Sequence, residues 1–207
     1  MTDSDEGWDD AYRADPPWEI GHAQPAFVTL ATEGKLRGRL LDAGCGTGEH
    51  ALLAAEHGAD ALGIDVASIA IRQARQKAKE RGMAVGFDVA SALQLQLLDE
   101  VFDVVVDSGL FHVFDDAQRQ AYVRGLGSVL VPGGHCYLMC FSEQTPGEWG
   151  PRRVTKDELC ASFDAGWTIE SIRAAYFELS ETFAAEKGFD RAAAWLATIR
   201  RADQPVG

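Results

Sequence analysis

The sequence lacks an apolar run long enough to cross a membrane. A spanning helix needs at least about 18 consecutive apolar residues, and none occurs among the 207 residues of the chain. The N-terminal stretch MTDSDEGWDD is acidic and polar, whereas a secretory signal combines basic residues with an apolar segment. We therefore expect a cytoplasmic protein that has no membrane partner.

Basic residues are also scarce. Lys and Arg total 19 against 32 Asp and Glu, which gives a formal net charge of -13. A nucleic-acid-binding surface needs clustered basic side chains, because these displace counterions from the phosphates. The densest basic stretch, Arg72 to Arg81, has helical spacing and is typical of a solvated helix face. We expect no nucleic-acid partner.

Cysteine is rare too, and the four cysteines form no paired framework, which is typical of a reducing compartment. Cys136 and Cys140 share one face of a predicted strand, but no further Cys or His pair lies nearby to complete a metal site. We interpret them as buried thiols and predict no metal. The hydrophobic content of 46% is sufficient for one sizeable core, and we predict one domain over residues 1–207.

What the sequence does contain is a repeated alternation of short apolar runs and helical patterns. Such an alternation predicts a parallel sheet that is wrapped by helices. The predicted strands are 39–43, 61–65, 85–89, 102–107 and 135–141, and the predicted helices are 47–57, 68–81 and 115–130.

The alternation changes after residue 141. We predict a helix over 156–163 and a long strand over 167–179. The alanines of 191–200 favour a helix, whereas the run from Trp195 to Ile199 permits a strand; we favour a strand that closes an antiparallel hairpin. We also predict a short helix over 25–32. The expected organisation is an N-terminal lid (1–35), a cofactor-binding core (39–141), and a substrate loop with the closing hairpin (142–207).

Three alternate glycines, Gly44, Gly46 and Gly48, lie where the first strand meets the first helix of the core. Glycine permits positive φ and lets a ligand approach bare backbone, and a helix N-terminus offers free N–H groups. The spacing is tighter than the Gly-x-Gly-x-x-Gly that accommodates a pyrophosphate. Asp42, just ahead, would repel phosphates and attract an ammonium group. These features predict a ligand with a cationic amino-acid end, and S-adenosylmethionine fits that description.

Asp65 ends the second predicted strand, about 20 residues past the glycines, where a carboxylate can hold both hydroxyls of a ribose. NAD-dependent enzymes share this requirement, so a nicotinamide-dependent oxidoreductase stays an alternative. The other interpretation is a helix N-cap, for which Ser68 is an equal candidate.

Four segments carry a family resemblance: LDAGCGTG at 41–48, GID at 63–65, FDVVVD at 102–107 and LVPGGH at 130–135. In this order and spacing, from Arg39 to Phe141, they resemble the class I S-adenosylmethionine-dependent methyltransferases. The resemblance implies a Rossmann-like α/β fold: a seven-stranded, mostly parallel sheet with helices on both faces and a C-terminal antiparallel hairpin.

The resemblance also implies how the cofactor is held. The glycines would contact its methionine part and Asp65 its ribose. For Asp107, at the end of the fourth predicted strand, we favour support of the amino-acid end over a role on the acceptor. Ser91 takes the place of an acidic residue that the family often uses for the adenine amino group, and a hydroxyl accepts this bond without charge assistance. The predicted cofactor-binding residues are Asp42, Gly44, Cys45, Gly46, Gly48, Asp65, Val66, Ser91, Ala92 and Asp107.

The N-terminal segment PPWEIGHAQP at 16–25 resembles the Pro-Trp-(Asp/Glu)-x-Gly stretch of thiol, halide and thiopurine methyltransferases, and of actinobacterial enzymes that methylate small heterocycles. There the segment folds over the cofactor, and its tryptophan lies near the transferred methyl. An equal alternative is that Trp18 only packs an N-terminal helix on the core. A dry aromatic site suits a reaction that neutralises a sulfonium. The predicted substrate-binding residues are Trp18, Phe111, Phe114 and Trp149.

His112 follows the fourth predicted strand, and we predict a catalytic role as general base for a hydroxyl or heterocyclic N–H acceptor. A hydrogen-bonded structural histidine is an equal alternative. Arg152 and Arg153 are either surface charges or steer an anionic acceptor. The Asn/Asp-Pro-Pro-aromatic loop of nucleic-acid amino methylation is absent.

The predicted function is S-adenosylmethionine-dependent methylation of a small molecule (a thiol, heterocycle or phenol) by a monomer or homodimer. The alternatives are a quinone or phenol O-methyltransferase of biosynthesis, the oxidoreductase, and a catalytically silent cofactor-binding module.

Overall fold

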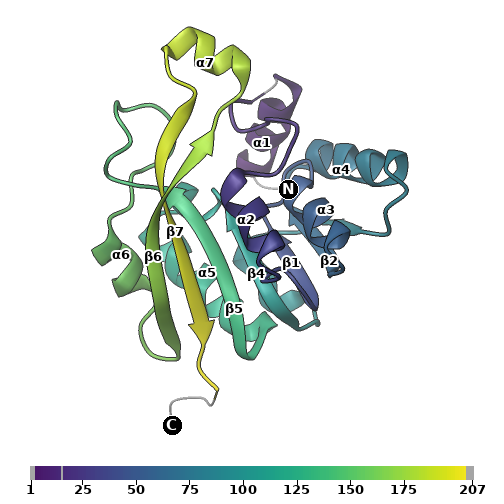
Figure 1. Ribbon diagram of the computed structural model, residues 1–207, viewed down its shortest axis with the longest axis vertical. Helices are drawn as coiled ribbons and strands as arrows, with labels where there is room; N and C mark the ends of the chain where they lie inside the picture. Colours follow the sequence, from purple (N-terminus) through teal and green to yellow (C-terminus); the bar gives the residue numbers. More distant parts are fainter. Residues whose placement is uncertain (1–2, 15, 204–207) are drawn as a thin grey trace.

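A computed structural model describes residues 3–14 and 16–203, and its strands form one sheet in the order β3-β2-β1-β4-β5-β7-β6 (Figure 1). Strands β1 to β5 run parallel, and β7 is antiparallel to both β5 and β6. This sheet confirms the predicted fold class. The strands are β1 (Arg39–Ala43), β2 (Asp60–Asp65), β3 (Gly86–Val89), β4 (Phe102–Ser108), β5 (Leu130–Phe141), β6 (Trp167–Glu178) and β7 (Arg191–Arg201).

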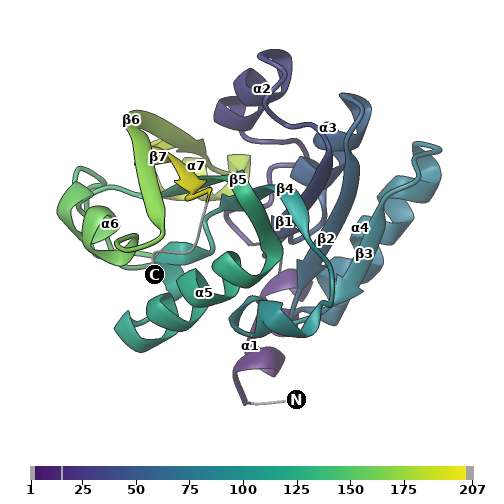
Figure 2. The ribbon, with the colours of Figure 1, turned by 90° about the horizontal axis from the view of Figure 1, so that it is seen from below.

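Helices cover both faces of the sheet (Figure 2). Helices α2, α3 and α4 pack on one face, and α5, α6 and the short η1 pack on the other. The central strand β4 is therefore apolar on both sides, with Val104 and Val106 in one core cluster and Val105 in the other. The helices are α1 (Asp3–Arg13), α2 (Pro25–Thr32), α3 (Glu49–Glu56), α4 (Ser68–Glu80), α5 (Asp116–Val129), α6 (Lys156–Ser162) and α7 (Glu181–Lys187), with 3-10 turns η1 (Ala92–Leu97) and η2 (Phe111–Val113).

The segment with the ambiguous pattern, 191–200, lies within strand β7. Its side chains alternate between the two core clusters: Ala194 and Leu196 face α2, whereas Trp195 and Ala197 face α5 and α6. A period of two residues is the pattern of a strand buried on both faces. The small alanines therefore fill positions in a covered sheet, and the predicted closing hairpin is confirmed.

Two helices were not predicted, and strand β5 begins five residues earlier than predicted. Helix α1 has Trp8, Ala11 and Tyr12 at helical spacing, but acidic residues surround them; α7 is only a short helix at the tip of the β6–β7 hairpin. Strand β5 begins at Leu130 rather than His135, because Leu130 pairs with Phe102 ahead of an irregularity in the register. Pro132–Gly134 lies in that irregularity, where proline is tolerated.

The carboxyl ends of β1 and β4 form the switch point of the sheet. The chain order runs from β1 to β2 and β3 on one side, and from β4 to β5 on the other. Ligands of open α/β sheets bind outside the strand ends at such a point. Helices α1 and α7 both lie at the same end of the molecule (Figure 1), and α1 packs against α4. The candidate site therefore lies at this edge of the sheet.

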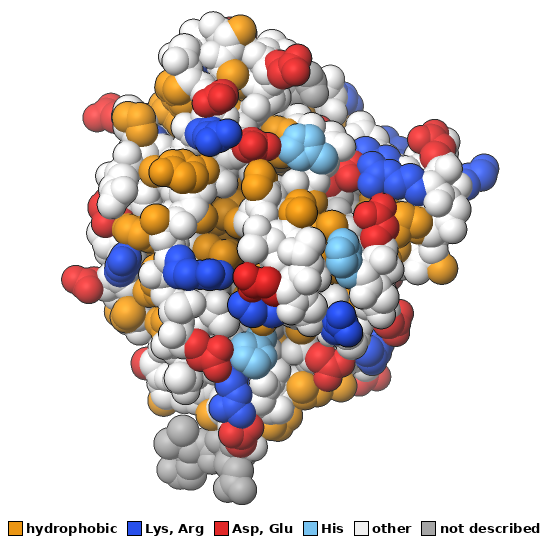
Figure 3. Space-filling view, viewed as in Figure 1, with side chains coloured by type: hydrophobic (Ala, Val, Ile, Leu, Met, Phe, Trp, Pro, Cys, Tyr) orange, Lys and Arg blue, Asp and Glu red, His pale blue; other side chains and the backbone are white. Residues whose placement is uncertain are grey.

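On the face seen in Figure 1, hydrophobic side chains gather between α7 and α2, and charges of both signs are interspersed around them (Figure 3). Among residues 3–14 and 16–203, no helix combines the length and apolarity that a membrane span requires. Within that same part of the chain, no group of three or more His, Cys, Asp and Glu residues is arranged to hold a metal ion.

Candidate functional site

The predicted glycine turn joins β1 to α3. Gly44, Gly46 and Gly48 have φ of 69°, 53° and 88°, a region that favours glycine. Gly48 is the N-cap of α3 and has no side chain, so Asp42 supplies the cap: its Oδ2 accepts a hydrogen bond from the Ala51 N–H at 3.0 Å. Asp42 is 1% exposed. The carboxylate that was predicted to face an ammonium group therefore also stabilises the first turn of α3.

Asp65 links the glycine turn to the next helix. Its Oδ2 accepts from the Gly46 N–H at 2.9 Å, and its Oδ1 accepts from the Ala67 N–H at 2.8 Å. Asp65 is not the N-cap of α4, because that position is Ala67, whose side chain makes no cap. The carboxylate lies directly beside bare backbone of the glycine turn, which is the arrangement that a ribose site next to an amino-acid site requires.

Three carboxylates gather at the ends of β1, β2 and β4. Burial raises the pKa of Asp42 to about 8, with repulsion from Asp65 and Asp107 adding to the shift. Burial likewise raises the pKa of Asp107 to about 7, and it raises the pKa of Asp65 above its usual range. A cation placed here would lower all three pKa values, because it stabilises the ionised carboxylates, whereas a diphosphate would raise them further. The electrostatics therefore suit a positively charged ligand.

Asp107 also shapes the turn that follows β4. Its Oδ1 accepts from the Leu110 N–H at 2.8 Å, and its Oδ2 accepts from the Phe111 N–H at 3.1 Å. The side chain is 0% exposed. Asp107 therefore holds the turn between β4 and η2 through two hydrogen bonds to its backbone.

The loop after β3 lies beside Asp65, since the Ala90 N–H donates to the Asp65 backbone carbonyl at 3.0 Å. The Ser91 hydroxyl accepts from the Leu93 N–H at 3.3 Å and so begins η1. Asp88 of β3 pairs instead with Arg75 at 3.1 Å, and both side chains are exposed. Three more predicted contacts share the edge: Cys45 is buried in the glycine turn, Val66 follows Asp65, and Ala92 follows Ser91.

His112 lies in η2, 5% exposed, under the rings of Phe141 and Phe177. Its Nδ1 accepts from the Phe141 N–H at 2.8 Å. Burial, with the nearby Arg119 and Arg153 adding to it, lowers the pKa of His112 to about 3. A neutral ring whose Nδ1 accepts carries its proton on Nε2, so this geometry presents an N–H donor rather than a free lone pair.

An aromatic wall stands next to His112, formed by residues of β5, β6, α7 and the loops. Trp149 contacts Phe141 with ring centroids 5.3 Å apart, and it contacts the rings of Phe183 and Phe189 at 5.1 and 5.4 Å. The members of the aromatic wall are Phe141, Trp149, Phe177, Phe183 and Phe189. The structure thus brings together two predicted site residues, His112 and Trp149.

The other predicted aromatic residues are placed differently. Phe111 and Phe114 belong to the core cluster beneath α5 and α6, on the opposite side of the sheet from Trp149. Trp18 is 42% exposed and contacts the rings of Trp8 and Tyr12 at the N-terminal segment. Phe111 and Phe114 therefore lie apart from Trp149. The ring contacts of Trp18 are with Trp8 and Tyr12 instead.

The two neighbouring arginines serve the loop after β5. Arg153 donates to the carbonyls of Trp149 and Pro151 at 2.7 and 2.6 Å, and its guanidinium lies over the Phe141 ring. Arg152 pairs with Asp116 at 2.6 Å. These contacts fix the loop and the position of Trp149, so they favour a structural role over the steering of an acceptor.

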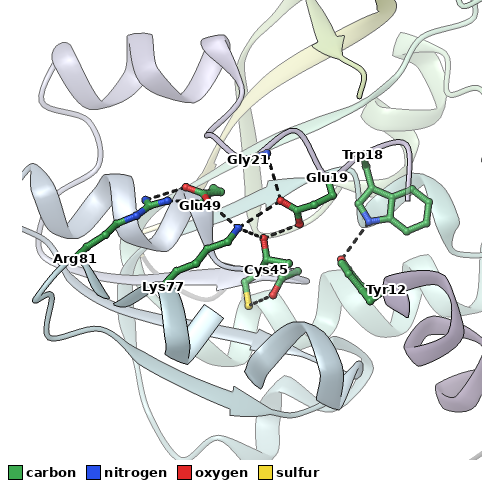
Figure 4. A network of polar contacts seen from close by, with 10 residues as sticks. Tyr12, Trp18, Glu19, Gly21, Cys45, Glu49, Lys77 and Arg81 are labelled. Atoms are coloured by element: carbon green, nitrogen blue, oxygen red, sulfur yellow. Dashed lines mark hydrogen bonds and ion pairs between the residues drawn. The ribbon is translucent and has the colours of Figure 1, made fainter. Parts of the chain in front are cut away.

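Sequence reasoning missed four residues that meet at the glycine turn: Tyr12, Glu19, Thr47 and Lys77 (Figure 4). The Tyr12 hydroxyl lies 2.6 Å from the point where a Cβ on Gly46 would stand. The helical spacing of Trp8, Ala11 and Tyr12 was the available signal for this helix. The contact between Glu19 and Lys77 had no signal in the sequence, because 58 residues separate the two.

Comparisons with known proteins identify the family of the chain. A sequence profile of the methyltransferase domain matches residues 40–134. A 2-heptyl-1-hydroxyquinolin-4(1H)-one methyltransferase of Mycobacteroides abscessus is 37% identical over 162 residues, which are 77% of this chain and 71% of that protein. The chain belongs to the class I S-adenosylmethionine-dependent methyltransferase family.

Two further relatives of this methyltransferase are similar over most of their length. A solved structure from work on the conversion of a disulfide bond into a thioacetal group during echinomycin biosynthesis has a TM-score of 0.88 and 34% identity, and it covers 97% of this chain and 94% of that chain. A probable thiol methyltransferase 2 of Arabidopsis thaliana is 28% identical over 155 residues, 73% of this chain and 69% of that protein. These relatives do not favour the oxidoreductase alternative.

Proposed function

We propose that this methyltransferase transfers the methyl group of S-adenosylmethionine to a small molecule: a thiol, a heterocycle or a phenol. The observation that carries the proposal is the group of three carboxyl side chains, Asp42, Asp65 and Asp107, around the glycine turn, where burial raises all three pKa values. A cationic nucleoside would stabilise the ionised form of these groups, whereas the negative diphosphate of a dinucleotide would not.

The residues present fit this cofactor. When bound, S-adenosylmethionine supplies a methyl group on a positively charged sulfur. The bare backbone of Gly44 and Gly46 would hold its amino-acid end, and the Asp65 carboxylate its ribose hydroxyls. Ser91, with Ala92 beside it, would hold the adenine. Each contact uses a group that already lies at the carboxyl edge of the sheet.

The residues around the acceptor would promote the reaction by holding the acceptor in place more than by transferring a proton. Methyl transfer needs an attacking atom held about 3 Å from the methyl carbon and in line with the bond that breaks. The aromatic wall would hold a flat or apolar acceptor, and the Nε2–H of His112 would donate a hydrogen bond to an oxygen or nitrogen of it. A His112 that acted as base would first have to change tautomer and lose its bond from the Phe141 N–H.

This arrangement favours acceptors that ionise without help from the enzyme. A thiol, with an ordinary pKa near 8.5, is partly ionised at neutral pH, and an acidic N-hydroxyl or phenol is ionised in the same way. The names of the relatives agree, since one acts on a hydroxyquinolinone and another is a probable thiol methyltransferase. These relatives favour neither a dedicated quinone or phenol O-methyltransferase nor a silent cofactor-binding module.

The test is a screen of labelled methyl transfer to a panel of small thiols, hydroxyarenes and azaheterocycles, with the parent chain and with His112→Gln. We expect transfer to at least one class, with the ionised acceptors favoured. If His112 only donates a hydrogen bond, His112→Gln retains part of the activity, because its amide also donates. Loss of all transfer to hydroxyarenes alone would instead indicate a general base. Tight binding of S-adenosylmethionine with no transfer across the panel would refute an enzymatic function.

A further inference from the structure

The described residues of the N-terminal segment, 3–14 and 16–24, lie beside the glycine turn, and a cluster of charged side chains attaches this segment there. We propose that Glu19 is a positioning residue that latches this segment, called here the lid, onto the glycine turn and so controls how fast the methyl donor and its product exchange. This inference rests on the proposed use of S-adenosylmethionine, but its first measurement needs no ligand.

The latch joins the lid to α3 and α4 (Figure 4). Thr47, within the glycine turn, donates from its hydroxyl to Glu19 Oε2 at 2.6 Å. Lys77 of α4 donates to Thr47 at 2.6 Å, to Glu49 at 2.8 Å and to Glu19 Oε1 at 3.4 Å. Arg81 binds Glu49 through two hydrogen bonds of 2.9 Å. Hydrogen bonds between charged groups are about twice as strong as neutral ones.

Burial makes this cluster more than an ordinary surface ion pair. The side chains of Glu19 and Lys77 are 21% and 24% exposed, and that of Glu49 is 9% exposed. Lys77 faces two carboxylates at once: Glu49 is also paired with Arg81, whereas the charge of Glu19 is compensated by Lys77. Partly buried charges are screened less by salt and are more costly to leave unpaired than exposed ones. A lid that lost Glu19 would therefore lose a strong attachment.

Trp18, the neighbour of Glu19 in the lid, links the latch to the predicted donor site. Trp18 donates from Nε1 to the Tyr12 hydroxyl at 3.2 Å, and that hydroxyl lies against Gly46, close to Asp65. Burial, then the charge of Asp65, raises the pKa of Tyr12 well above its usual value, so Tyr12 stays a neutral hydroxyl. Among the residues whose side chains the structure describes, none accepts a hydrogen bond from it. Its proton is thus available to the donor.

The remaining attachments hold the ends of the lid. In α1, Asp9 Oδ1 accepts from the Ile69 N–H at 2.9 Å and caps α4. On the opposite side, the Ser180 N–H donates to the Pro17 carbonyl at 2.9 Å. The side chain of Gln24 makes two hydrogen bonds with the backbone of Glu178. Among the hydrogen bonds of the described lid residues, that of Glu19 is made with the glycine turn itself, so its loss should loosen the lid locally and leave the fold intact.

The experiment compares Glu19→Gln, Lys77→Met, the double variant and Tyr12→Phe with the parent. The matched control is Glu100→Gln, which removes the same charge from an exposed pair with Arg39 beyond the amino end of β1. In unliganded protein, hydrogen exchange of residues 7–14 and 16–20 should be faster in Glu19→Gln and unchanged in the control. Melting curves check that each variant stays folded.

With ligand, the readout is the release rate of S-adenosylhomocysteine, followed by tryptophan fluorescence, together with the KM of donor and of acceptor. We expect Glu19→Gln to raise the release rate and the donor KM about 5- to 20-fold, with the acceptor KM changed less than twofold. Because Glu19 and Lys77 belong to one latch, the release rate and the donor KM of the double variant should not exceed those of the more affected single variant. Added salt should accelerate release in the parent more than in Glu19→Gln.

Unchanged exchange and release rates in Glu19→Gln would overturn the proposal, as would equal changes in Glu100→Gln. Equal effects on donor and acceptor KM would indicate a general loss of structure and would also overturn it. If the parent binds neither S-adenosylmethionine nor S-adenosylhomocysteine, the proposed function fails, whereas the exchange data on unliganded protein still decide whether the latch exists.

Discussion

Asp65→Asn removes one carboxylate oxygen and the charge from the predicted ribose site while keeping the size of the side chain. Hydrogen bonds to a charged group contribute about 1.5–3 kcal/mol, so we expect the Kd for S-adenosylmethionine to rise about 10- to 150-fold. The parent carboxylate also accepts from the Gly46 and Ala67 N–H groups, and an asparagine oxygen can accept from only one of them. That loss opposes the relief of burying a carboxylate whose pKa is raised, and we expect Tm to stay within about 4 °C of the parent.

Titration calorimetry with S-adenosylmethionine and with S-adenosylhomocysteine measures the change. Asp88→Asn is the control, because Asp88 lies on the neighbouring strand with its exposed side chain beside Arg75, and its affinity should match that of the parent. An unchanged Kd in Asp65→Asn, in a variant that melts cooperatively, would refute the assignment of the ribose site. Equal weakening in both variants would show that net charge, rather than this contact, governs binding.

Two further predictions concern the glycine turn and its charges. Gly48→Ala should reduce the free energy of unfolding by about 2–5 kcal/mol, since its Cβ would combine a left-handed φ with a 2.6 Å approach to the Phe87 ring; Gly82→Ala, with φ of 64° and open space around it, should cost only about 1–2 kcal/mol in the same denaturant titration. Equal costs would show that the ring moves aside. The second prediction is proton release on binding: the folded pKa of Asp42, about 8, lies above its unfolded value of about 3.9, so this group lowers stability as pH rises from about 4 to 8. A cationic donor that lowers this pKa should bind more tightly as pH rises from 6 to 8.5 and should release protons. Calorimetry in buffers of different ionisation enthalpy measures that release, and it should be smaller in Asp42→Asn, whose amide oxygen still accepts from Ala51. Heats that do not depend on the buffer would contradict this linkage.

Much of the fold could be predicted because its signals are local. Strands β1, β2 and β4 are short and mainly apolar, and the glycines and caps between them end each predicted element within one residue of where the structure ends it. Helix α1 was missed because its spacing of apolar residues competes with a strongly acidic composition. The start of β5 was misplaced because a proline and two glycines are tolerated inside an irregular strand pairing, which the sequence does not reveal.

The candidate site divides in the same way. Gly44, Gly46 and Gly48 could be recognised because all three lie in one short turn, where their spacing is visible in the sequence. Burial of Phe111 and Phe114 in the core could not be predicted, since the turn after β4 decides which face of the sheet each ring meets. The latch between Glu19 and Lys77 depends on the packing of α4 beside the glycine turn, and only the folded chain brings those two side chains together.

The β6–β7 hairpin, which carries α7, contributes to the aromatic wall but not to the glycine turn. Its strand pairing ends at Glu178 and Arg191, so the connection between them can change in length or composition without shifting the register of the sheet. That connection supplies Phe183 and Phe189 of the aromatic wall, whereas the glycine turn and Asp65 come from the first half of the sequence. On the proposed function, exchange of this connection would change which acceptor the aromatic wall admits, while the glycine turn and Asp65 keep their places in the sheet.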